Sequence, residues 1–550
     1  MLDRFPNGSE PMPSKSSLSP TLARARVAYL MLAAVCLASC GGGGSATPST
    51  SSPAIAPAIL ALTPCAPSGV TGATDYQVGD GQAYTELEQV PWENLRAGDT
   101  VRIHHRATAY KGKFMLSAQG TAIAPVRVCG IRNASNQRPT IDGSGATTRP
   151  ALETLYGSTT VTAGRTVREI HQSRSIVVFK QTTAQSSSAY PQHIQLDGLH
   201  FTRAHPSYSY TDGGGVVRSY DQFGACIWVE RGHNITIADN EISDCQMAIF
   251  SKSTDDGLFA RTHDLRVAGN YFHGNGVVGS FLEHTTYLQS VNLVVELNHY
   301  GPMRSGAGGN QHKDRSVGSV IRYNRIEGGA HNLDLVEAED FYVYATGAGA
   351  TDYRRAFVYG NLLNIGSGSR AVVHYGGDHF TSVPGDNWGE GIFRKGTLYF
   401  FHNTVQASAN ARLFRISTTE ETVEAWNNVF VANAGTLSLR ERENDPIGAA
   451  WTPDGVLNLG RNWISSGWSL GNAALQGSVS GTANLLTGAS SPISASTWSP
   501  LAGGNVIVDN AAATPTAASG HPVTRHFDTS LVPVARPVNG TAADLGAVER

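Results

Sequence analysis

The chain has 550 residues, of which 41 are Lys or Arg and 44 are Asp or Glu, so its formal net charge is −3. This near balance leaves no strongly basic footprint, and we therefore expect no nucleic-acid partner. Sixty glycines and a charged fraction of only 15% favour stacked strands and turns over helices.

The N-terminus carries a targeting segment. Arg24 and Arg26 precede the apolar run VAYLMLAAVCLA, and the small residues that follow end at Cys40. This sequence resembles the bacterial lipobox, which implies that residues 1–39 are a signal peptide and that Cys40 is lipidated. An ordinary cleaved signal peptide or a short membrane anchor is the alternative, although the apolar run is short for a membrane span.

Residues 40–64 begin with four glycines and continue as SATPSTSSPAIAPA. Gly-, Ser- and Pro-rich composition predicts a flexible tether between an acylated Cys40 and a folded domain. Gly41 is not the aspartate that retains lipoproteins in the inner membrane. The expectation is therefore an outer-membrane lipoprotein of a Gram-negative cell, bound to the lipid bilayer on the periplasmic or the cell-surface face.

Four further cysteines are expected to remain in the mature chain, namely Cys65, Cys129, Cys226 and Cys245. An even number in an oxidising compartment favours disulfides over metal binding, and no Cys/His spacing indicates zinc. A Cys65–Cys129 bond would join the start of the chain to the first coils, and a Cys226–Cys245 bond would join neighbouring coils. The cysteine count alone leaves the pairing open.

One short pattern occurs eight times between residues 234 and 464: alternating apolar residues, an asparagine, then another apolar residue. The shared asparagines are Asn240, Asn270, Asn298, Asn324, Asn361, Asn403, Asn428 and Asn462, separated by 30, 28, 26, 37, 42, 25 and 34 residues. A constant motif at variable spacing indicates a solenoid with loops of different length. Each asparagine is expected to sit in left-handed backbone at a tight turn and to bond to the next asparagine.

Alternation of period two makes each repeat a strand with one buried face, which excludes an α-solenoid. A propeller would need four strands per repeat at a steadier period. The sequence therefore predicts an all-β, single-domain parallel β-helix over residues 65–550, with an N-terminal cap and C-terminal strands. We expect a monomer.

The segments LRAGDTVRIHHR and RPTIDGSGA, together with the asparagine repeats, resemble bacterial right-handed parallel β-helix proteins of the pectate-lyase-like superfamily. Residues 310–340 are similar to a block in secreted members labelled polysaccharide lyase-like. The resemblance covers nearly the whole mature chain. It implies the fold, while activity within this fold varies among lyases, hydrolases and binding proteins.

The strands that follow the asparagine turns form a column in which titratable residues are concentrated. It contains Glu283, His284, His312, Lys313, Arg315, Asp334, Glu337, His374, Tyr375 and Arg415. Lys313 and Arg315 are two residues apart and share a strand face. Because Leu333 and Leu335 favour the core, Asp334 is expected to point outward toward this basic pair.

Such a surface suits an acidic, uronate-containing polysaccharide. The resemblance implies cleavage by β-elimination, with Lys313 as the base and Arg315 binding the carboxylate, or with these roles exchanged. His312, His374 or Tyr375 would protonate the leaving oxygen. Glu283, His284 and Arg415 would contact the substrate. A base at Lys313 requires a lowered pKa, which Arg315 favours and Asp334 opposes.

Related Lys/Arg lyases carry an Arg-His pair on the next coil, where this chain has LDLVE. Asp334 and Glu337 are therefore expected either to hold Ca²⁺ or to neutralise Lys313 and Arg315. Two alternatives to a lyase stay open. One is a non-catalytic polysaccharide-binding or structural surface protein, and the other is a glycoside hydrolase using Asp334 with Glu337 or Asp255 with Asp256.

The lipobox hypothesis is tested by a Cys40→Ser variant. Loss of the acylated thiol is expected to release the protein from the membrane fraction, because no other anchor is predicted. Fractionation of cells that express either form checks this. Complete retention of the variant in membranes would contradict the assignment.

Overall fold

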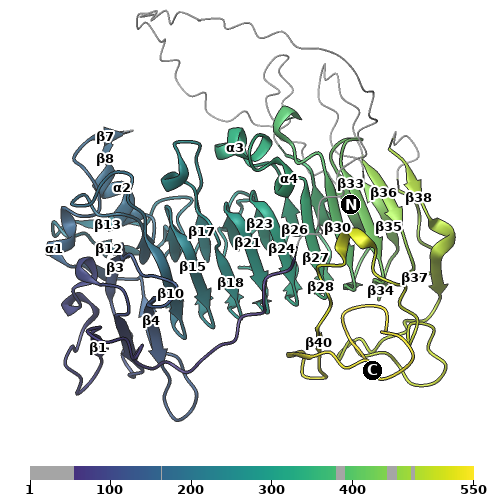
Figure 1. Ribbon diagram of the computed structural model, residues 1–550, viewed down its shortest axis with the longest axis horizontal. Coiled ribbons are helices and arrows are strands. Elements are labelled where there is room, and N and C mark those ends of the chain that lie inside the picture. Colours follow the sequence, from purple (N-terminus) through teal and green to yellow (C-terminus); the bar gives the residue numbers. More distant parts are fainter. Residues whose placement is uncertain (1–54, 163, 379–389, 442–454, 472–476) are drawn as a thin grey trace, which may run out of the picture. The chain divides into compact units, whose positions relative to one another are not determined.

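The computed structural model describes residues 55–162, 164–378, 390–441, 455–471 and 477–550. Three long sheets run side by side along the molecule (Figure 1), and consecutive strands of each sheet come from successive coils of the chain. Nearly all pairs are parallel. The right-handed parallel β-helix predicted from the sequence is confirmed. No helix in these ranges is long and apolar enough to cross a membrane.

The first sheet contains β1 (Asp75–Val78), β2 (Thr100–His104), β4 (Val126–Ile131), β10 (Gln192–Asp197), β15 (His233–Ala238), β18 (Arg266–Ala268), β21 (Val291–Glu296), β24 (Val317–Arg322), β27 (Arg355–Tyr359), β30 (Thr397–Phe401), β33 (Thr422–Trp426), β36 (Val456–Leu459) and β38 (Val479–Ser480).

The second sheet contains β5 (Thr140–Asp142), β11 (His200–Thr202), β16 (Glu241–Ser243), β19 (Tyr271–His273), β22 (His299–Tyr300), β25 (Arg325–Glu327), β28 (Leu362–Ile365), β31 (Thr404–Ala407), β34 (Val429–Ala432), β37 (Asn462–Ser465) and β39 (Leu485–Gly488).

The third sheet contains β13 (Val217–Ser219), β12 (Ser209–Thr211), β6 (Ala146–Thr148), β3 (Gly112–Leu116), β9 (Val177–Phe179), β14 (Ile227–Val229), β17 (Ile249–Ser251), β20 (Thr286–Leu288), β23 (His312–Asp314), β26 (His331–Leu335), β29 (Ala371–Tyr375), β32 (Ala411–Ile416) and β35 (Leu437–Glu441). Short helices α1 (Pro150–Glu153), α2 (Val167–Ser173), α3 (Tyr342–Thr346) and α4 (Ala350–Tyr353) and hairpins β7–β8 (Val161–Thr162, Arg165–Thr166) and β40–β41 (Arg525–Phe527, Pro533–Ala535) lie in the connections.

An asparagine ladder fixes the corner between the first and second sheets. The backbone N–H and Nδ2 of Asn270 donate to Oδ1 of Asn298 at 3.0 Å each. The same pair of bonds links every asparagine from Asn240 to Asn462 to its successor. All eight side chains are buried. Each buried amide is therefore satisfied by the neighbouring coil.

The expected left-handed backbone at these asparagines is wrong by one position. Before seven of the eight asparagines the preceding residue is left-handed, for example Asp239 with φ 52° and Tyr323 with φ 56°. This residue makes the turn, so that the following asparagine can direct its amide into the corner. Glycine fills the position at Gly269 and Gly360, where φ is 64° and 66°.

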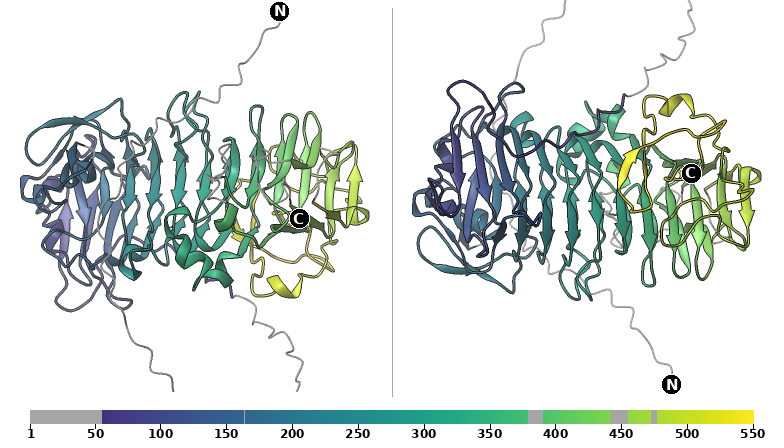
Figure 2. Two further views of the ribbon diagram at one scale, coloured as in Figure 1. Left: turned by 90° about the horizontal axis from the view of Figure 1, so that it is seen from above. Right: turned by 90° about the horizontal axis from the view of Figure 1, so that it is seen from below.

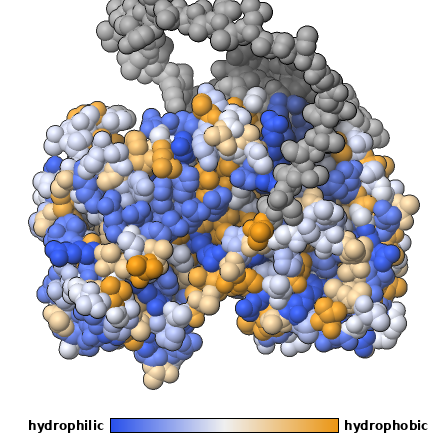
Figure 3. Space-filling view, in the orientation of Figure 1, coloured by the Kyte–Doolittle hydropathy of each residue, from blue (hydrophilic) through white to orange (hydrophobic). Residues whose placement is uncertain are grey.

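Residues 55–64, which we call the strap, cross the outer face of the first sheet (Figures 1 and 2). The side chain of Arg322 donates to Pro57 O at 2.7 Å, Arg266 donates to Ala58 O at 2.7 Å, and Leu60 N–H donates to Glu296 at 2.9 Å. Hydrophobic side chains gather where the strap crosses this face (Figure 3). These residues are therefore not part of a flexible tether. Residues 40–54, including Cys40, lie outside the described residues.

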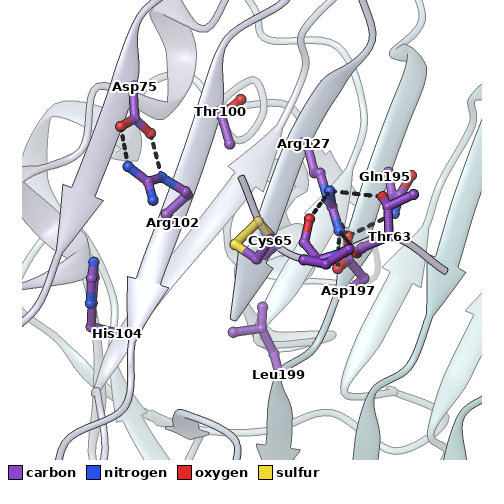
Figure 4. The surroundings of a disulfide bond; sticks show 12 residues. Thr63, Cys65, Asp75, Thr100, Arg102, His104, Arg127, Gln195, Asp197 and Leu199 are labelled. Carbon is purple, nitrogen blue, oxygen red and sulfur yellow. Dashed lines mark hydrogen bonds and ion pairs between the residues drawn. A yellow bond between two sulfur atoms is a disulfide. The ribbon is translucent and has the colours of Figure 1, made fainter. Parts of the chain in front are cut away.

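The strap ends at the Cys65–Cys129 disulfide, which ties it to β4 (Figure 4). Beside this bond, Arg127 donates to Thr63 O at 2.7 Å and to both oxygens of Asp197 at 2.9 Å. A second disulfide joins Cys226 and Cys245 on neighbouring coils. Both pairs are those considered from the sequence.

The C-terminal residues 489–550 cover the outer face of the second sheet. Ile493, Ile507 and Leu545 form one apolar cluster with Val429 and Trp463 of that sheet. A second cluster joins Trp498, Phe527, Ala547 and Val548 to Leu362. The β-helix proper therefore ends near residue 488, and the two ends of the chain cover parts of two of its three outer faces.

Substitution of one ladder residue tests how strongly the corner stabilises the fold. Asn324→Ala leaves the buried N–H and Nδ2 of Asn298 without their acceptor, and we expect a loss of about 2–4 kcal/mol in unfolding free energy. Denaturant unfolding measures this. The matched control Asn458→Ala removes a half-buried amide that donates to Glu424 and accepts from the exposed Ser480, and it should cost at most about 1 kcal/mol. Equal effects would contradict the role of the ladder.

Candidate functional site

A groove of about 590 Å³ lies along the third sheet. Six residues of the predicted column line it, namely His284, Lys313, Arg315, Asp334, His374 and Arg415. Residues that the sequence analysis did not propose complete the lining: Phe223, Met247, Phe250, Phe281, Leu282, Tyr287, Gln289, Gly308, Asn310, Ala330, His331, Glu339, Asp340, Arg370 and Asp378. The groove is therefore built mainly on the outer face of the third sheet, which neither the strap nor residues 489–550 cover.

Strand register brings the central residues together. Parallel pairing places Tyr287 beside Lys313, Lys313 beside Asp334, and Asp334 beside His374. Arg415 follows on the next coil. These outward side chains alternate with inward residues such as Leu333 and Leu335, as the sequence predicted.

Lys313 and Arg315 lie in a network of ion pairs. The Lys313 ammonium is 3.0 Å from Asp334 Oδ2 and also binds Asp378. Arg315 is 2.8 Å from Asp378 and 3.2 Å from Glu337. Neither cation is left without a carboxylate. Of the two roles proposed for the acidic residues, neutralisation of the basic pair is the one that the geometry shows.

These contacts set the charge state of Lys313. Burial lowers the pKa of Lys313, but attraction by Asp334 and Asp378 outweighs burial and the repulsion of Arg315, so the net shift is upward. The same pairing, with a hydrogen bond from His374, overcomes burial and holds the pKa of Asp334 well below its usual range. Lys313 is thus a cation at neutral pH. The lowered pKa that a lysine base requires is absent, which makes that assignment wrong for this arrangement.

Two predicted proton donors point into the interior. His312 pairs in register with Leu333, its Nδ1 is 2.8 Å from Thr286 Oγ1, and burial lowers its pKa to about 4. Tyr375 pairs with Leu335 and belongs to the apolar core. Each lies one position from an outward residue and therefore faces the other side of its strand. Neither lines the groove, so substrate contact by these two residues is excluded in this fold.

The roles predicted for Glu283, as a substrate contact, and for Glu337, as a calcium ligand, are not supported by their positions. Glu283 is buried and does not line the groove, although the adjacent His284 does. Glu337 is fully buried, with Oε2 accepting from Asp378 N–H at 3.0 Å beside Arg315. Calcium prefers six to eight oxygen ligands. Asp334 and Glu337 each already bind a cation, so this residue set does not fit Ca²⁺.

His331, Asp334 and His374 lie close together, with one ligand atom from each within 4.8 Å of the others. His374 Nδ1 is 2.8 Å from Asp334 Oδ1, while the other oxygen of Asp334 binds Lys313 and accepts from Asn310 Nδ2 at 2.7 Å. Both oxygens of Asp334 therefore already have partners on the protein.

Several groove residues were missed because they lie outside the alternating pattern. His331 begins β26, and its Nδ1 is 3.0 Å from Asn310 Oδ1. Asp378 follows β29 and reaches back to Lys313 and Arg315. Arg370 precedes β29 and is exposed. Tyr287 and Phe250 follow the pattern and could have been found, because Tyr287 stands in register with Lys313 and Phe250 with Tyr287.

No protein-family model matches the sequence, and no curated protein is detectably similar. Among solved structures, an alginate lyase from Paenibacillus sp. str. FPU-7 aligns at 13% identity and a TM-score of 0.40, covering 66% of this chain and 97% of that chain. A mannuronic acid specific polysaccharide family 6 lyase from human gut microbiota aligns at 10% identity and 0.37, covering 72% and 79%. The Streptococcus pneumoniae surface protein and adhesin PfbA aligns at 11% and 0.34, covering 71% and 89%. These likenesses concern architecture alone.

An interior ion pair beneath the groove provides a stability test. Asp314, between Lys313 and Arg315, points inward and lies 3.3 Å from Arg394, and both side chains are fully buried. Asp314→Ala leaves Arg394 unpaired in the interior and should cost about 3–5 kcal/mol. In the control Asp352→Ala, an exposed partner of Arg355 is removed, and the expected loss is at most about 1 kcal/mol. Denaturant midpoints of both variants check this, and similar losses would contradict it.

The groove network also predicts a pH dependence. Since the folded pKa of Asp334 is depressed, its stabilisation is present above the unfolded value of about 3.9 and is lost as the pH falls through the folded pKa. Since the folded pKa of Lys313 is raised, its stabilisation is present below about 10.4 and is lost as the pH rises through the folded pKa. An Asp334→Asn variant should therefore lose less stability than the wild type below about pH 4. Parallel acid unfolding curves would contradict this.

Proposed function

We propose that this protein acts on carbohydrate and cleaves an acidic, uronate-containing polysaccharide in the groove by β-elimination. The observation that carries the proposal is the juxtaposition, on one accessible strand face, of cations with imidazole and phenol side chains. β-Elimination needs these three kinds of group: one to neutralise the uronate carboxylate, one to accept the C5 proton and one to protonate the leaving oxygen.

Arg370 and Lys313 neutralise the sugar carboxylate in this proposal. Arg370 is exposed in the groove and makes no ion pair among the residues that the structure describes. Lys313 remains protonated because of Asp334 and Asp378. A cation that binds the carboxylate stabilises the negative charge that develops when the C5 proton leaves. This role replaces the base role expected from the sequence.

His331 is the proposed base. The oxygen of Asn310 can only accept a hydrogen bond, so the 3.0 Å contact assigns the hydrogen to His331 Nδ1 and the lone pair to Nε2. Nε2 takes the C5 proton, the C5–H electrons form the C4=C5 double bond, and the C4–O4 bond breaks. His331 lines the groove, whereas His312, which was predicted as a proton donor, does not.

Tyr287 is the proposed acid for the leaving O4. Its hydroxyl oxygen accepts from Arg315 Nε at 2.7 Å and its hydrogen is directed to Glu339 Oε1 at 3.1 Å. Burial raises the pKa of Tyr287, and the nearby Arg315 opposes that rise. Arg315 thus supports the phenolate formed when Tyr287 gives its proton to O4. Bulk water restores the starting protonation states of both residues.

A hydrolase is the second candidate, supported by one observation. Asp334 and Asp378 both bind the Lys313 ammonium, which places two carboxylates beside one groove position. Paired carboxylates are the catalytic groups of most glycosidases. The pair Asp334 and Asp378 takes the place of the predicted pair Asp334 and Glu337, because Glu337 is fully buried. A hydrolase would create reducing ends without a C4=C5 double bond.

The proposal includes attachment through acylated Cys40 to the outer membrane of a Gram-negative cell. Its support is the leader and cysteine sequence alone, since Cys40 precedes the described residues. Attachment would confine cleavage to polysaccharide at the cell surface or in the periplasm.

The test is a screen of acidic polysaccharides for the ultraviolet absorbance of unsaturated uronate ends. His331→Ala should lower kcat by about 10²–10⁴-fold because it removes the base, while binding is retained. His299→Ala is the control, since this histidine binds Glu327 on the second sheet, away from the groove. Reducing ends without unsaturated product would identify a hydrolase. Polysaccharide binding without any cleavage would identify a non-catalytic protein.

A further inference from the structure

The column that carries the charged cluster continues toward the N-terminal coils as a row of aromatic side chains. Trp228 pairs in register with Phe250, and Phe250 pairs with Tyr287. The rings of Trp228 and Phe250 stack at 4.0 Å, and those of Phe250 and Tyr287 meet edge to face at 5.2 Å. From Phe250 to Arg415 there are five coil-to-coil steps, or about 24 Å at one strand spacing each.

Exposed apolar side chains widen this end of the groove. Phe281 is 63% exposed, Phe223 47% and Leu282 44%, and all three line the same groove as Phe250. They come from the loops that precede β14 and β20. An exposed cluster of large apolar groups continuous with a polar cleft is typical of a ligand subsite, because solvent exposure of such groups is otherwise unfavourable.

Carboxylates lie beside the aromatic end. Glu339 accepts a hydrogen bond from the Tyr287 hydroxyl, and Asp340 accepts one from Gln289 Nε2 at 2.8 Å. The groove cations Lys313, Arg370 and Arg415 belong to later coils. The cations at this end already bind carboxylates of the protein: Arg315 lies 3.5 Å from Glu339, and Arg174, over the Trp228 ring, lies 2.7 Å from Glu230. A uronate at the aromatic end would therefore have to compete with these carboxylates. An uncharged sugar would present hydroxyl or amide N–H donors to the same carboxylates.

We infer that the groove takes a mixed polysaccharide, in which a uronate at Lys313 and Arg370 neighbours an uncharged sugar bound at Phe250. The uncharged unit presents an apolar ring face or an acyl methyl group to Phe250, Phe223 and Phe281. This inference rests on the proposed function for the uronate position. It adds the chemical class of the neighbouring sugar unit. It disfavours polymers made only of uronate, because every unit of such a chain is charged.

The test compares two probes of equal length on the full-length protein carrying His331→Ala, so that binding is measured without turnover. One probe is a hyaluronan oligosaccharide, in which uronate alternates with an N-acetylated hexose, and the other is an oligogalacturonate. Calorimetry is expected to show at least about tenfold tighter binding of the mixed probe, the scale of a few apolar contacts in a pocket. Equal or tighter binding of the oligogalacturonate overturns the inference.

Two variants locate the effect. Phe281→Ser changes an exposed loop residue, and Phe250→Ala removes the ring that lies against Trp228. Each should weaken binding of the mixed probe by about tenfold and leave oligogalacturonate binding unchanged. Phe259→Ala is the control, since this ring packs under Arg231 outside the groove. Melting temperatures verify folding, and the exposed Phe281 keeps the test valid if Phe250→Ala is unstable. Unchanged mixed-probe binding in a folded Phe281→Ser variant overturns the inference.

The two proposals fail separately. Selective, phenylalanine-dependent binding without unsaturated products from the His331-containing protein would refute the lyase and retain the mixed-polymer subsite. Unsaturated products formed equally from both classes of polymer would retain the lyase and refute the subsite.

Discussion

Parallel pairing between consecutive coils is the constraint on which the rest of this molecule depends. A strand has a side-chain period of two, so a shift of one residue would exchange the inner and outer faces of a coil. The asparagine ladder opposes such a shift, because each buried amide finds its partners only when the next coil is in register. Tyr287, Lys313 and Asp334 form a site only as long as this register holds.

Ion pairing determines the charge states of the residues that this register brings together. Burying Lys313 and Arg315 without partners would be costly, and Asp334, Asp378 and Glu337 offset that cost. The compensation fixes Lys313 as a cation, which is why the proposed proton acceptor is an imidazole. In the proposed lyase a ligand carboxylate competes with carboxylates of the protein, so Arg370, which stands outside the network, would provide the first contact.

The sequence predicts the parts of the site that obey strand alternation. Asparagine spacing gives the solenoid, and Leu333 and Leu335 correctly direct Asp334 toward Lys313. The same rule, applied strictly, would have excluded His312 and Tyr375, which are adjacent to outward residues. Asp378 and Arg370 flank a strand, and their direction depends on loop conformation. Arg394 reaches Asp314 across the interior from 80 positions later in the chain, and no local pattern encodes such a contact.

The strap has a mechanical consequence. Its bonds to Arg322, Glu296 and Arg266 are spread along the first sheet, so a pull on residue 55 breaks them one after another instead of loading all of them together. Peeling stops at Cys65, where the covalent bond to Cys129 delivers the remaining force to β4. This strand is held between β2 and β10, and the terminal strand β1 is bypassed. Under tension the N-terminal segment would thus lengthen only by the short strap, while the coils that form the groove stay unstrained.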